Sequence, residues 1–204
     1  MRAIKEAVTD IPANIRAEIG GVSFSGHMTS ALIVDRSLRP ITLCLPLSDM
    51  RGVPLLDGLK ALQDRWKEIT GNTYGALGWI LKVRWLLAQP GVAERAHSVL
   101  FAKDYLRAVL TDTVGMEYTD AGNTGLMDYN TFCWDARAVA LSGIPRELLP
   151  DIHAPYDNAG PLPQSWADLL GLPHGIPVFY GGADMACGAL GSGLHEDDGD
   201  IAIA

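Results

Sequence analysis

The sequence has few cysteines, and its cysteines and histidines are not spaced as metal ligands. Cys44, Cys133 and Cys187 stand far apart in a chain of 204 residues. Such isolated thiols are typical of reduced cysteines in the core of a cytoplasmic protein. The five histidines form no HxxxH or HxxE pair. The sequence therefore gives little support for a structural zinc site.

Excess positive charge and long apolar runs are also lacking. Lys plus Arg number 16 against 24 Asp plus Glu, a formal net charge of −8. Nucleic-acid-binding proteins usually carry a basic patch, so this balance argues against a nucleic-acid partner. No apolar run approaches the roughly 20 residues that a membrane span needs, and the charged first residues do not form a signal peptide. We therefore expect a cytoplasmic protein without a membrane partner.

Strand-like and helix-like segments alternate along the chain, which predicts an α/β fold with a central sheet. The period of the apolar residues predicts helices at 2–8, 55–69, 76–88, 102–110, 134–142, 164–170 and 184–192. Apolar runs bounded by turn residues predict strands at 19–26, 31–35, 41–45, 98–101, 177–180 and 201–203. The polar segment 112–132 is expected to be loop with short strands, and 196–199 an acidic turn.

Charged and aromatic residues on the predicted helices receive ordinary roles. Lys82 is expected in solvent, as are three residues of the helix at 102–110: Lys103, Asp104 and Arg107. Trp79 and Trp85 lie six positions apart on one helix and so face different sides. Core packing is therefore favoured over a platform on which a sugar stacks.

A glycine-rich stretch joins the strand at 177–180 to the helix at 184–192. Gly181 and Gly182 permit a positive φ or a close approach of two backbones. Asp184 follows at the helix start, where it is either an N-cap that stabilises the helix by about 1 kcal/mol or a proton acceptor at the ligand-binding edge of the sheet. Gly188 and Gly191 suit a helix packed closely on another backbone, or one that a neighbouring domain approaches.

Residues 181–193 resemble the GGGDNAAGAVGAG segment of the FGGY carbohydrate kinases, whose aspartate is the general base. Five other segments resemble the family in the same order along the chain. Residues 23–28 resemble its SxSGQMHG sugar-binding strand, 49–51 its DxR, 103–111 its PKDYLRYRLTG helix, 118–128 its YSDASGTxLxD segment, and 199–203 the strand that opens its second domain. Together they cover nearly the whole chain, and the resemblance is to xylulokinase-like members.

The resemblance implies a ribonuclease H-like, actin-like ATPase fold, of which this chain is an incomplete first domain with a central mixed sheet flanked by helices. Residues 1–198 would be the N-terminal, sugar-binding domain without its leading strands. Residues 199–204 would be the first strand of the missing C-terminal nucleotide-binding domain, which is an expected partner. The family's DxGTxxxK hairpin and GTSG phosphate loop are not found in this sequence. An unpaired sheet edge predicts a poorly soluble chain or a homo-oligomer.

By resemblance, the chain is part of a carbohydrate kinase that transfers the γ-phosphoryl group of ATP to a hydroxyl of a pentulose or polyol. ATP and Mg²⁺ would be the cofactors of the full-length enzyme, with neither clearly bound by this chain. Asp184 would be the catalytic base, and the substrate-binding residues would be His27, Met28, Thr29, Asp49, Arg51, Asp120 and Met185. His27, Thr29 and Met185 replace the family's Gln, His and Asn, which favours a less hydroxylated, longer or differently configured substrate.

Other interpretations stay open for these residues and for the chain. His27 and Thr29 could be strand-end residues that bind no ligand. Asp49 and Arg51 could form a surface ion pair, and Asp120 could stabilise a turn. The chain itself suits a non-catalytic remnant or a sugar-binding module, and ATP turnover by it alone is not expected. An α/β enzyme that uses Asp184 for hydrolysis or isomerisation ranks last, because neither a nucleophile elbow nor a metal cluster is found.

Overall fold

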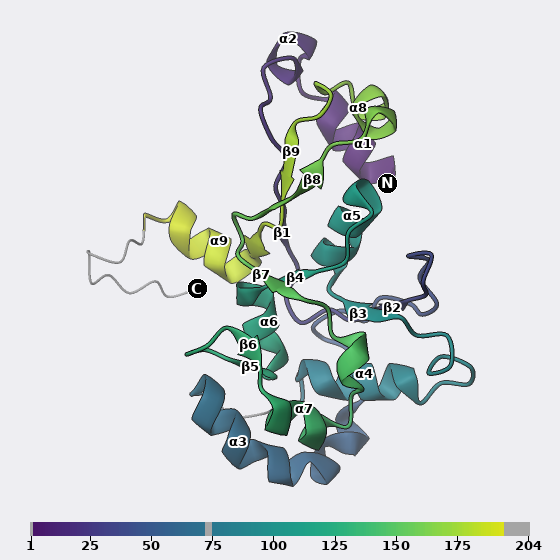
Figure 1. Ribbon diagram of the computed structural model, residues 1–204, viewed down its shortest axis with the longest axis vertical. Helices are drawn as coiled ribbons and strands as arrows, with labels where there is room; N and C mark the ends of the chain where they lie inside the picture. The colour runs from purple at the N-terminus through teal and green to yellow at the C-terminus, as the bar shows by residue number, and fades with distance from the viewer. Residues whose placement is uncertain (1, 72–74, 194–204) are drawn as a thin grey trace.

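The structure, a computed structural model, describes residues 2–71 and 75–193 (Figure 1). Its α-helices are α1 (Arg2–Thr9), α2 (Ala13–Arg16), α3 (Lys60–Thr70), α4 (Trp79–Leu87), α5 (Ala102–Thr111), α6 (Tyr118–Thr124), α7 (Ala136–Ser142), α8 (Gln164–Leu170) and α9 (Asp184–Gly191). Its 3₁₀ helices are η1 (Val53–Leu59) and η2 (Arg146–Leu148). Its strands are β1 (Ser25–Gly26), β2 (Leu32–Val34), β3 (Ser98–Leu100), β4 (Met116–Glu117), β5 (Met127–Asp128), β6 (Cys133–Trp134), β7 (Ile152–His153), β8 (Asn158–Pro161), β9 (Pro177–Phe179) and β10 (Gly182–Ala183).

The strands form pairs, some parallel and some antiparallel. β1–β10 and β4–β7 are parallel, whereas β2–β3, β5–β6 and β8–β9 are antiparallel. The mixed α/β class is thereby confirmed. Within the described ranges the strands form two-stranded sheets, and isolated bridges such as Val22–Val178 extend the pairing. The parallel β1–β10 pair is the feature that matters for the site, because it joins the segment before residue 27 to the segment before residue 184.

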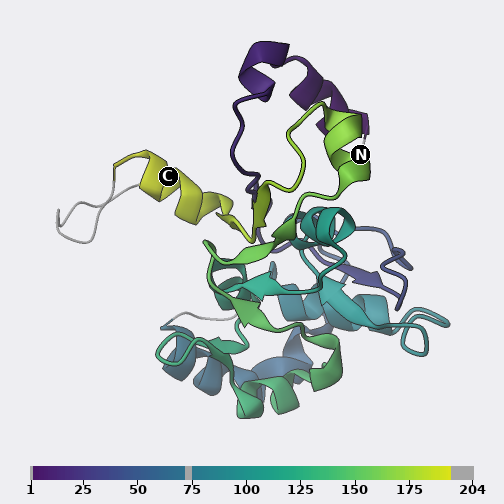
Figure 2. The same ribbon diagram turned by 45° about the horizontal axis from the view of Figure 1, so that its top comes forward.

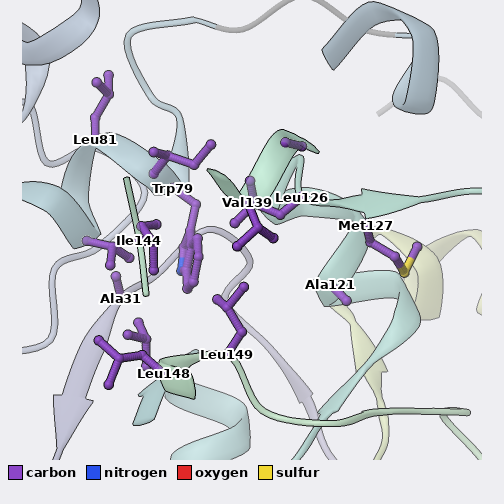
Figure 3. Close-up of a cluster of buried hydrophobic side chains, with 14 of the residues drawn as sticks. Ala31, Trp79, Leu81, Ala121, Leu126, Met127, Val139, Ile144, Leu148 and Leu149 are labelled. Carbon is purple, nitrogen blue, oxygen red and sulfur yellow. The ribbon is translucent and has the colours of Figure 1, made fainter. Parts of the chain in front are cut away.

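The main hydrophobic core lies among α3, α4, α6 and α7 in the lower half of Figure 1. Leu62, Trp66 and Ile69 recur along α3 at the spacing of one helix face, and all three are buried. Trp79 at the start of α4 is fully buried and stacks on Phe101, with ring centroids 5.7 Å apart. Figure 3 shows the Trp79 ring surrounded by aliphatic side chains. The expected core role of Trp79 is confirmed.

A smaller apolar cluster lies at the opposite end of the molecule. Figures 1 and 2 both show α1 beside α8 there, above the β8–β9 pair. Leu162, Leu170 and Val178 are buried in this cluster, and Ile4 and Val8 of α1 pack against it. The apolar face predicted for the first helix therefore holds that helix on α8.

Two predicted elements are wrong. Residues 41–45 do not form a strand. Ile41 donates to the Ile33 carbonyl and Leu45 forms an isolated bridge with Ala31, but between them the Ile33 amide donates to the Thr42 hydroxyl instead of to a backbone carbonyl. The segment 112–132, predicted to be loop with short strands, contains the helix α6. The predicted acidic turn at 196–199 and the strand at 201–203 lie outside the described residues.

Two expectations about side-chain environment are also wrong. Lys82 is not in solvent: it is fully buried, and its Nζ donates to the carbonyl of Leu77 at 2.7 Å. Burial lowers the pKa of this ammonium group. The cysteines are free but do not lie in the core, since Cys44 and Cys133 are exposed and Cys187 is half-buried.

Candidate functional site

The turn between β9 and α9 brings two backbones close together. Gly181 has φ +77°, and a Cβ added to it would lie 2.0 Å from the carbonyl oxygen of Phe24. Only glycine tolerates this conformation and this contact without strain. Gly182 then pairs with Ser25 in the parallel β1–β10 sheet. The close approach predicted for these two glycines is confirmed, and it delivers the chain to the start of α9.

Asp184 is the first residue of α9, and its carboxylate is exposed. The cap position belongs to Ala183, which makes no side-chain hydrogen bond. Asp184 Oδ1 accepts from the backbone N–H of Met185 at 2.8 Å. The carboxylate is therefore held at the helix start while remaining open to solvent, and the simple N-cap interpretation does not describe it. Its role as a base stays a prediction.

Helix α9 has no buried residue and projects from the molecule as the yellow helix in Figure 1. A Cβ added at Gly188 or Gly191 would meet nothing within 4 Å. These glycines therefore do not serve close packing within the described part of the chain, and that interpretation is wrong. The alternative, that another domain approaches this helix, stays a prediction.

The segment after β1 is fixed by Ser30. The Ser30 hydroxyl donates to the carbonyl of His27 at 3.0 Å and accepts from the N–H of Ala102 at the start of α5. Thr29 has φ +58°, an uncommon conformation for a β-branched residue and a local strain that often marks a functional segment. The His27 side chain is exposed, that of Met28 half-buried and that of Thr29 buried.

A hollow of about 320 Å³ lies between this segment, α6 and the start of α9. We call it the Met28–Met185 hollow, and it is lined by Met28, Tyr118, Thr119, Asn123, Tyr129, Phe132, Ala183, Met185 and Ala186. Among the predicted site residues, it brings Met28 and Met185 together, and Asp184 lies between two of its lining residues in the chain. Its hydroxyl and amide groups suit a ligand with several hydroxyls.

Three lining residues with polar side chains, Tyr118, Asn123 and Tyr129, are not among the predicted site residues. Tyr118 also packs against Phe132, with ring centroids 5.0 Å apart. Both Tyr118 and Asn123 lie on α6, in the segment predicted to be loop with short strands. The sequence carried only a weak signal for this helix, because its cap is Glu117, which is not a preferred cap residue, although it accepts from the N–H groups of Thr119 and Asp120 at 2.6 and 3.0 Å.

A larger hollow, of about 550 Å³, adjoins the first and shares Tyr118, Thr119 and Ala186 with it. Its remaining walls are mainly apolar and include Phe179 and Leu190. None of the predicted site residues lines it. An apolar wall cannot satisfy the hydroxyl groups of a sugar, so the smaller hollow fits such a ligand better despite its lesser volume.

Asp120 lines neither hollow, although its neighbour on α6, Thr119, lines both. Its carboxylate is fully buried, with Oδ2 3.2 Å from Lys103 Nζ at ion-pair distance but without hydrogen-bond alignment. The same ammonium group lies 3.2 Å from Asp104 and 3.3 Å from Glu117. The expected solvent exposure of Lys103, Asp104 and Arg107 is therefore wrong, and the predicted contact of Asp120 with a sugar has no support from this placement.

Three carboxylates in this cluster face two cations, Lys103 and Arg107. The Arg107 guanidinium donates to the carbonyl of Gly115 and lies over the Tyr180 ring, 4.2 Å from its centroid. Burial raises the pKa of Asp120 to about 8, with the Lys103 charge opposing and the neighbouring carboxylates adding to the shift. Burial also lowers the pKa of Lys103, but the three carboxylates outweigh it and the net shift is upward.

Asp49 and Arg51 form an ion pair away from the Met28–Met185 hollow. Arg51 Nε donates to Asp49 Oδ2 at 2.9 Å, and this bond lowers the pKa of the carboxyl group. The Arg51 guanidinium also stacks on Trp85, 4.6 Å from the ring centroid, beside a separate hollow of about 190 Å³. The structure thus shows the ion pair and the partial packing of Trp85, and the predicted sugar contact of the pair stays a prediction.

The described residues contain neither a membrane-crossing helix nor a metal-binding cluster. No helix among them is long and apolar enough to cross a membrane. No group of three or more His, Cys, Asp or Glu side chains in residues 2–71 and 75–193 is arranged to hold a metal ion.

Similar proteins agree with the fold and with the motifs. The chain is 29% identical over 201 residues to a xylulose kinase of Lactococcus lactis and 30% identical over 198 residues to one of Staphylococcus epidermidis. Both alignments cover 96% of this chain. They cover 40% of the Lactococcus protein and 39% of the Staphylococcus protein, so this chain spans less than half the length of these relatives. An autoinducer-2 kinase of Salmonella choleraesuis is 29% identical over 182 residues, 86% of this chain and 34% of that protein.

Solved structures give the same result. A ligand-bound xylulose kinase from Lactobacillus acidophilus superposes with a TM-score of 0.84 at 22% identity, covering 94% of this chain and 40% of that one. A xylulose kinase from Rhodospirillum rubrum gives 0.80 at 27% identity, with 87% and 37% covered. The profile of the FGGY family of carbohydrate kinases, N-terminal domain, matches residues 1–191. The chain therefore belongs to the FGGY family of carbohydrate kinases and has the actin-like ATPase fold of these sugar kinases.

Proposed function

We propose that this chain is the sugar-binding part of an ATP-dependent carbohydrate kinase. The observation that carries the proposal is the exposed carboxylate of Asp184 at the start of α9, beside a hollow that joins Met28 to Met185. The first curated relatives are more than twice as long as this chain. Residues 1–198 would form the sugar-binding domain, and residues 199–204 would begin a nucleotide-binding domain that completes the enzyme in the cytoplasm.

In the proposed reaction Asp184 acts as the general base. A substrate hydroxyl would donate a hydrogen bond to the Asp184 carboxylate, which would accept the proton as the hydroxyl oxygen bonds to the γ-phosphorus of ATP. The bond between that phosphorus and the β,γ-bridging oxygen would break, and ADP would leave with its electron pair. Phosphoryl transfer depends mainly on positioning and on charge stabilisation, so a correctly placed base is the chief contribution of this part of the chain. An exposed carboxylate on a helix that projects from the molecule can meet a second domain that closes over it.

The substrate is proposed to be a polyol or keto sugar with one less polar side. Relatives are named for xylulose, gluconate, glycerol and autoinducer-2. Asn123, Tyr118 and Tyr129 can exchange hydrogen bonds with hydroxyl groups in the Met28–Met185 hollow. The two methionines offer apolar, adaptable contacts instead. His27 and Thr29 stay proposed contacts at the rim, whereas Asp49 and Arg51 would act at most as a more distant support.

ATP and Mg²⁺ would be bound mainly by the rest of such an enzyme. The described residues hold no metal-binding cluster, so they do not by themselves fit a magnesium site. No step of the reaction is therefore assigned to these residues through the metal or the nucleotide. Their proposed work is to bind the sugar, to orient one hydroxyl and to accept its proton.

The test is a kinetic assay of the natural gene product that contains this chain. Sugar-dependent ADP formation is measured with D-xylulose, gluconate, glycerol and related polyols, for the wild type and for Asp184→Asn. We expect Asp184→Asn to lower kcat by about 100-fold or more, because a general base contributes about 10²–10⁴. Asp57→Asn is the matched control, since the Asp57 carboxylate is 92% exposed on η1 and pairs with Lys60 at the surface.

A full rate in Asp184→Asn would refute the role of this carboxylate as the base. Absence of turnover with every sugar, together with retained sugar binding in a titration calorimeter, would favour the alternative of a non-catalytic sugar-binding module. Sequencing the DNA on both sides of this segment comes first, because it decides whether phosphate-binding loops accompany the chain. Light scattering of the purified chain tests the predicted homo-oligomer.

A further inference from the structure

The start of α9 is tied to α6 by one polar contact. The backbone N–H of Ala183, the residue before Asp184, donates to the hydroxyl oxygen of Thr119 at 2.9 Å. We propose that Thr119 is a positioning residue for Asp184: its hydroxyl, oriented by Glu117, fixes the backbone from which the carboxylate projects. This inference rests on the proposed function, in which Asp184 is the base.

The direction of the hydrogen bonds is determined by chemistry. Thr119 Oγ1 lies 2.9 and 2.7 Å from the two carboxylate oxygens of Glu117. A backbone N–H can only donate, so Thr119 Oγ1 accepts from Ala183, and its single hydroxyl proton points toward the nearby oxygens of Glu117. The lone pairs of the hydroxyl are then free to accept from Ala183. A hydroxyl with its proton held elsewhere is a better defined acceptor than one that can rotate.

Glu117 is itself held on several sides. It is fully buried, caps α6 through the N–H groups of Thr119 and Asp120, and lies 3.3 Å from Lys103 Nζ. Lys103 also donates to the carbonyl of Tyr180 at 3.3 Å, just before the Gly181–Gly182 turn. The buried ammonium group of Lys103 therefore contacts both the Glu117 carboxylate, which orients Thr119, and the backbone of Tyr180, which leads to Asp184.

Little else in the described part of the chain fixes α9. The helix has no buried residue, so apolar packing does not set its direction. Its support consists of the short β1–β10 pair before it, the hydrogen bond from the Gly181 N–H to the Pro155 carbonyl at 2.9 Å, and the Thr119 contact at its cap residue. Because a displacement of about 1 Å at a catalytic group can lower a rate about 100-fold, the loss of this contact should be seen in kcat.

The experiment compares three substitutions of one half-buried residue. Thr119→Val keeps the shape and removes the hydroxyl, Thr119→Ala removes it without added bulk, and Thr119→Ser retains it. Amide hydrogen exchange of the chain should show the protection of the Ala183 N–H falling about tenfold in the first two variants. The serine variant should stay within about twofold of the wild type.

The kinetic half uses the natural gene product that contains this chain. Thr119→Val and Thr119→Ala should lower kcat by about 10- to 100-fold with the sugar KM changed less than about threefold, and Thr119→Ser should restore most of kcat. Unchanged kcat in both hydroxyl-free variants, or an equal loss in the serine variant, would overturn the positioning role.

The two proposals fail in different ways. If Asp184→Asn keeps its rate, the base assignment is wrong, and so is a positioning role defined by it. If Asp184→Asn loses its rate while Thr119→Val keeps its own, the base assignment stands and only the inference about Thr119 is wrong. The double variant should be no slower than Asp184→Asn alone, because positioning has no value once the base is gone.

Discussion

Replacing Asp120 with asparagine should stabilise this protein, and the gain should grow as the pH rises. Asp120 shares Lys103 with two other buried carboxylates, of Asp104 and Glu117, all within 3.3 Å of the ammonium nitrogen. Both oxygens of Asp120 are buried without a hydrogen-bond donor in ordinary geometry. Ionising all three carboxylates leaves the cluster one negative charge in excess even with Arg107 included. Asparagine has nearly the same shape and removes that charge.

The sign follows from the pKa of Asp120 in the two states. Burial, with the nearby carboxylates, raises it from 3.8 to about 8 in the folded chain. The folded state then holds a proton that the unfolded state has released. This stabilising contribution is complete below pH 3.8 and is lost as the pH rises to about 8. The uncharged amide of the Asp120→Asn variant would carry no such dependence.

The size of the effect is bounded by two estimates. The rise of the Asp120 pKa from 3.8 to about 8 corresponds to at most about 6 kcal/mol. Removing one partner from a buried ion pair, which leaves an uncompensated charge, costs about 3–5 kcal/mol. Asp120 has only partial compensation from Lys103, so we expect the free energy of unfolding of Asp120→Asn to exceed that of the wild type by about 3 kcal/mol at pH 8.5. The difference should be small at pH 5.

Equilibrium urea unfolding of both proteins between pH 5 and pH 9 measures this difference. Asp57→Asn, at a carboxylate that is 92% exposed, is the control and should follow the wild type at every pH. The reasoning would be refuted if Asp120→Asn were less stable than the wild type at pH 8.5. That result would mean that the ionised Asp120 is needed to hold Lys103.

The remaining predictions concern packing and capping, and each is measured by urea unfolding. Gly125→Ala should lower the free energy of unfolding by more than about 3 kcal/mol, because φ is +71° and the new Cβ would lie 0.9 Å from the Trp66 ring. Gly188→Ala, on the exposed helix α9, should instead raise the free energy of unfolding by about 0.5–1 kcal/mol. Equal effects of the two substitutions would contradict the reasoning, which rests on a steric clash at Gly125 and open space at Gly188. Asp135→Ala should cost about 2 kcal/mol, since this residue caps α7 and pairs with Arg65; a cost near zero would show that the pair is solvent-screened.

Local pattern predicted most of the helices of this fold. The stripe of Leu62, Trp66 and Ile69 is buried along α3 as its spacing indicates. Helix α6 was missed because glutamate is an uncommon cap and Gly122 weakens the helical pattern. The strand expected at 41–45 does not form for a different reason: the Ile33 amide donates to the hydroxyl of Thr42 instead of to a backbone carbonyl of a partner strand.

The placement of the candidate site residues was predictable only in part. The sequence predicts Asp184 at a helix start, as the structure has it, and the structure puts Met28 and Met185 in the lining of one hollow. The motifs gave no sign that Asp120 is buried against Lys103 and does not line that hollow. Motif resemblance reports which residues belong to a segment, but not which face of the segment each side chain occupies.

By itself the sequence determined the family, the start of α9 and the need for glycine at position 181, where φ is +77°. These depend on residue type and on near neighbours. Only the tertiary structure decided that Lys103 and Glu117 are buried together and that Thr119 holds the residue before Asp184. From sequence alone a charged side chain is expected at the surface, because burying a charge without a compensating partner is costly. Here the compensating partners come from segments far apart in the chain, and only the folded structure brings them together.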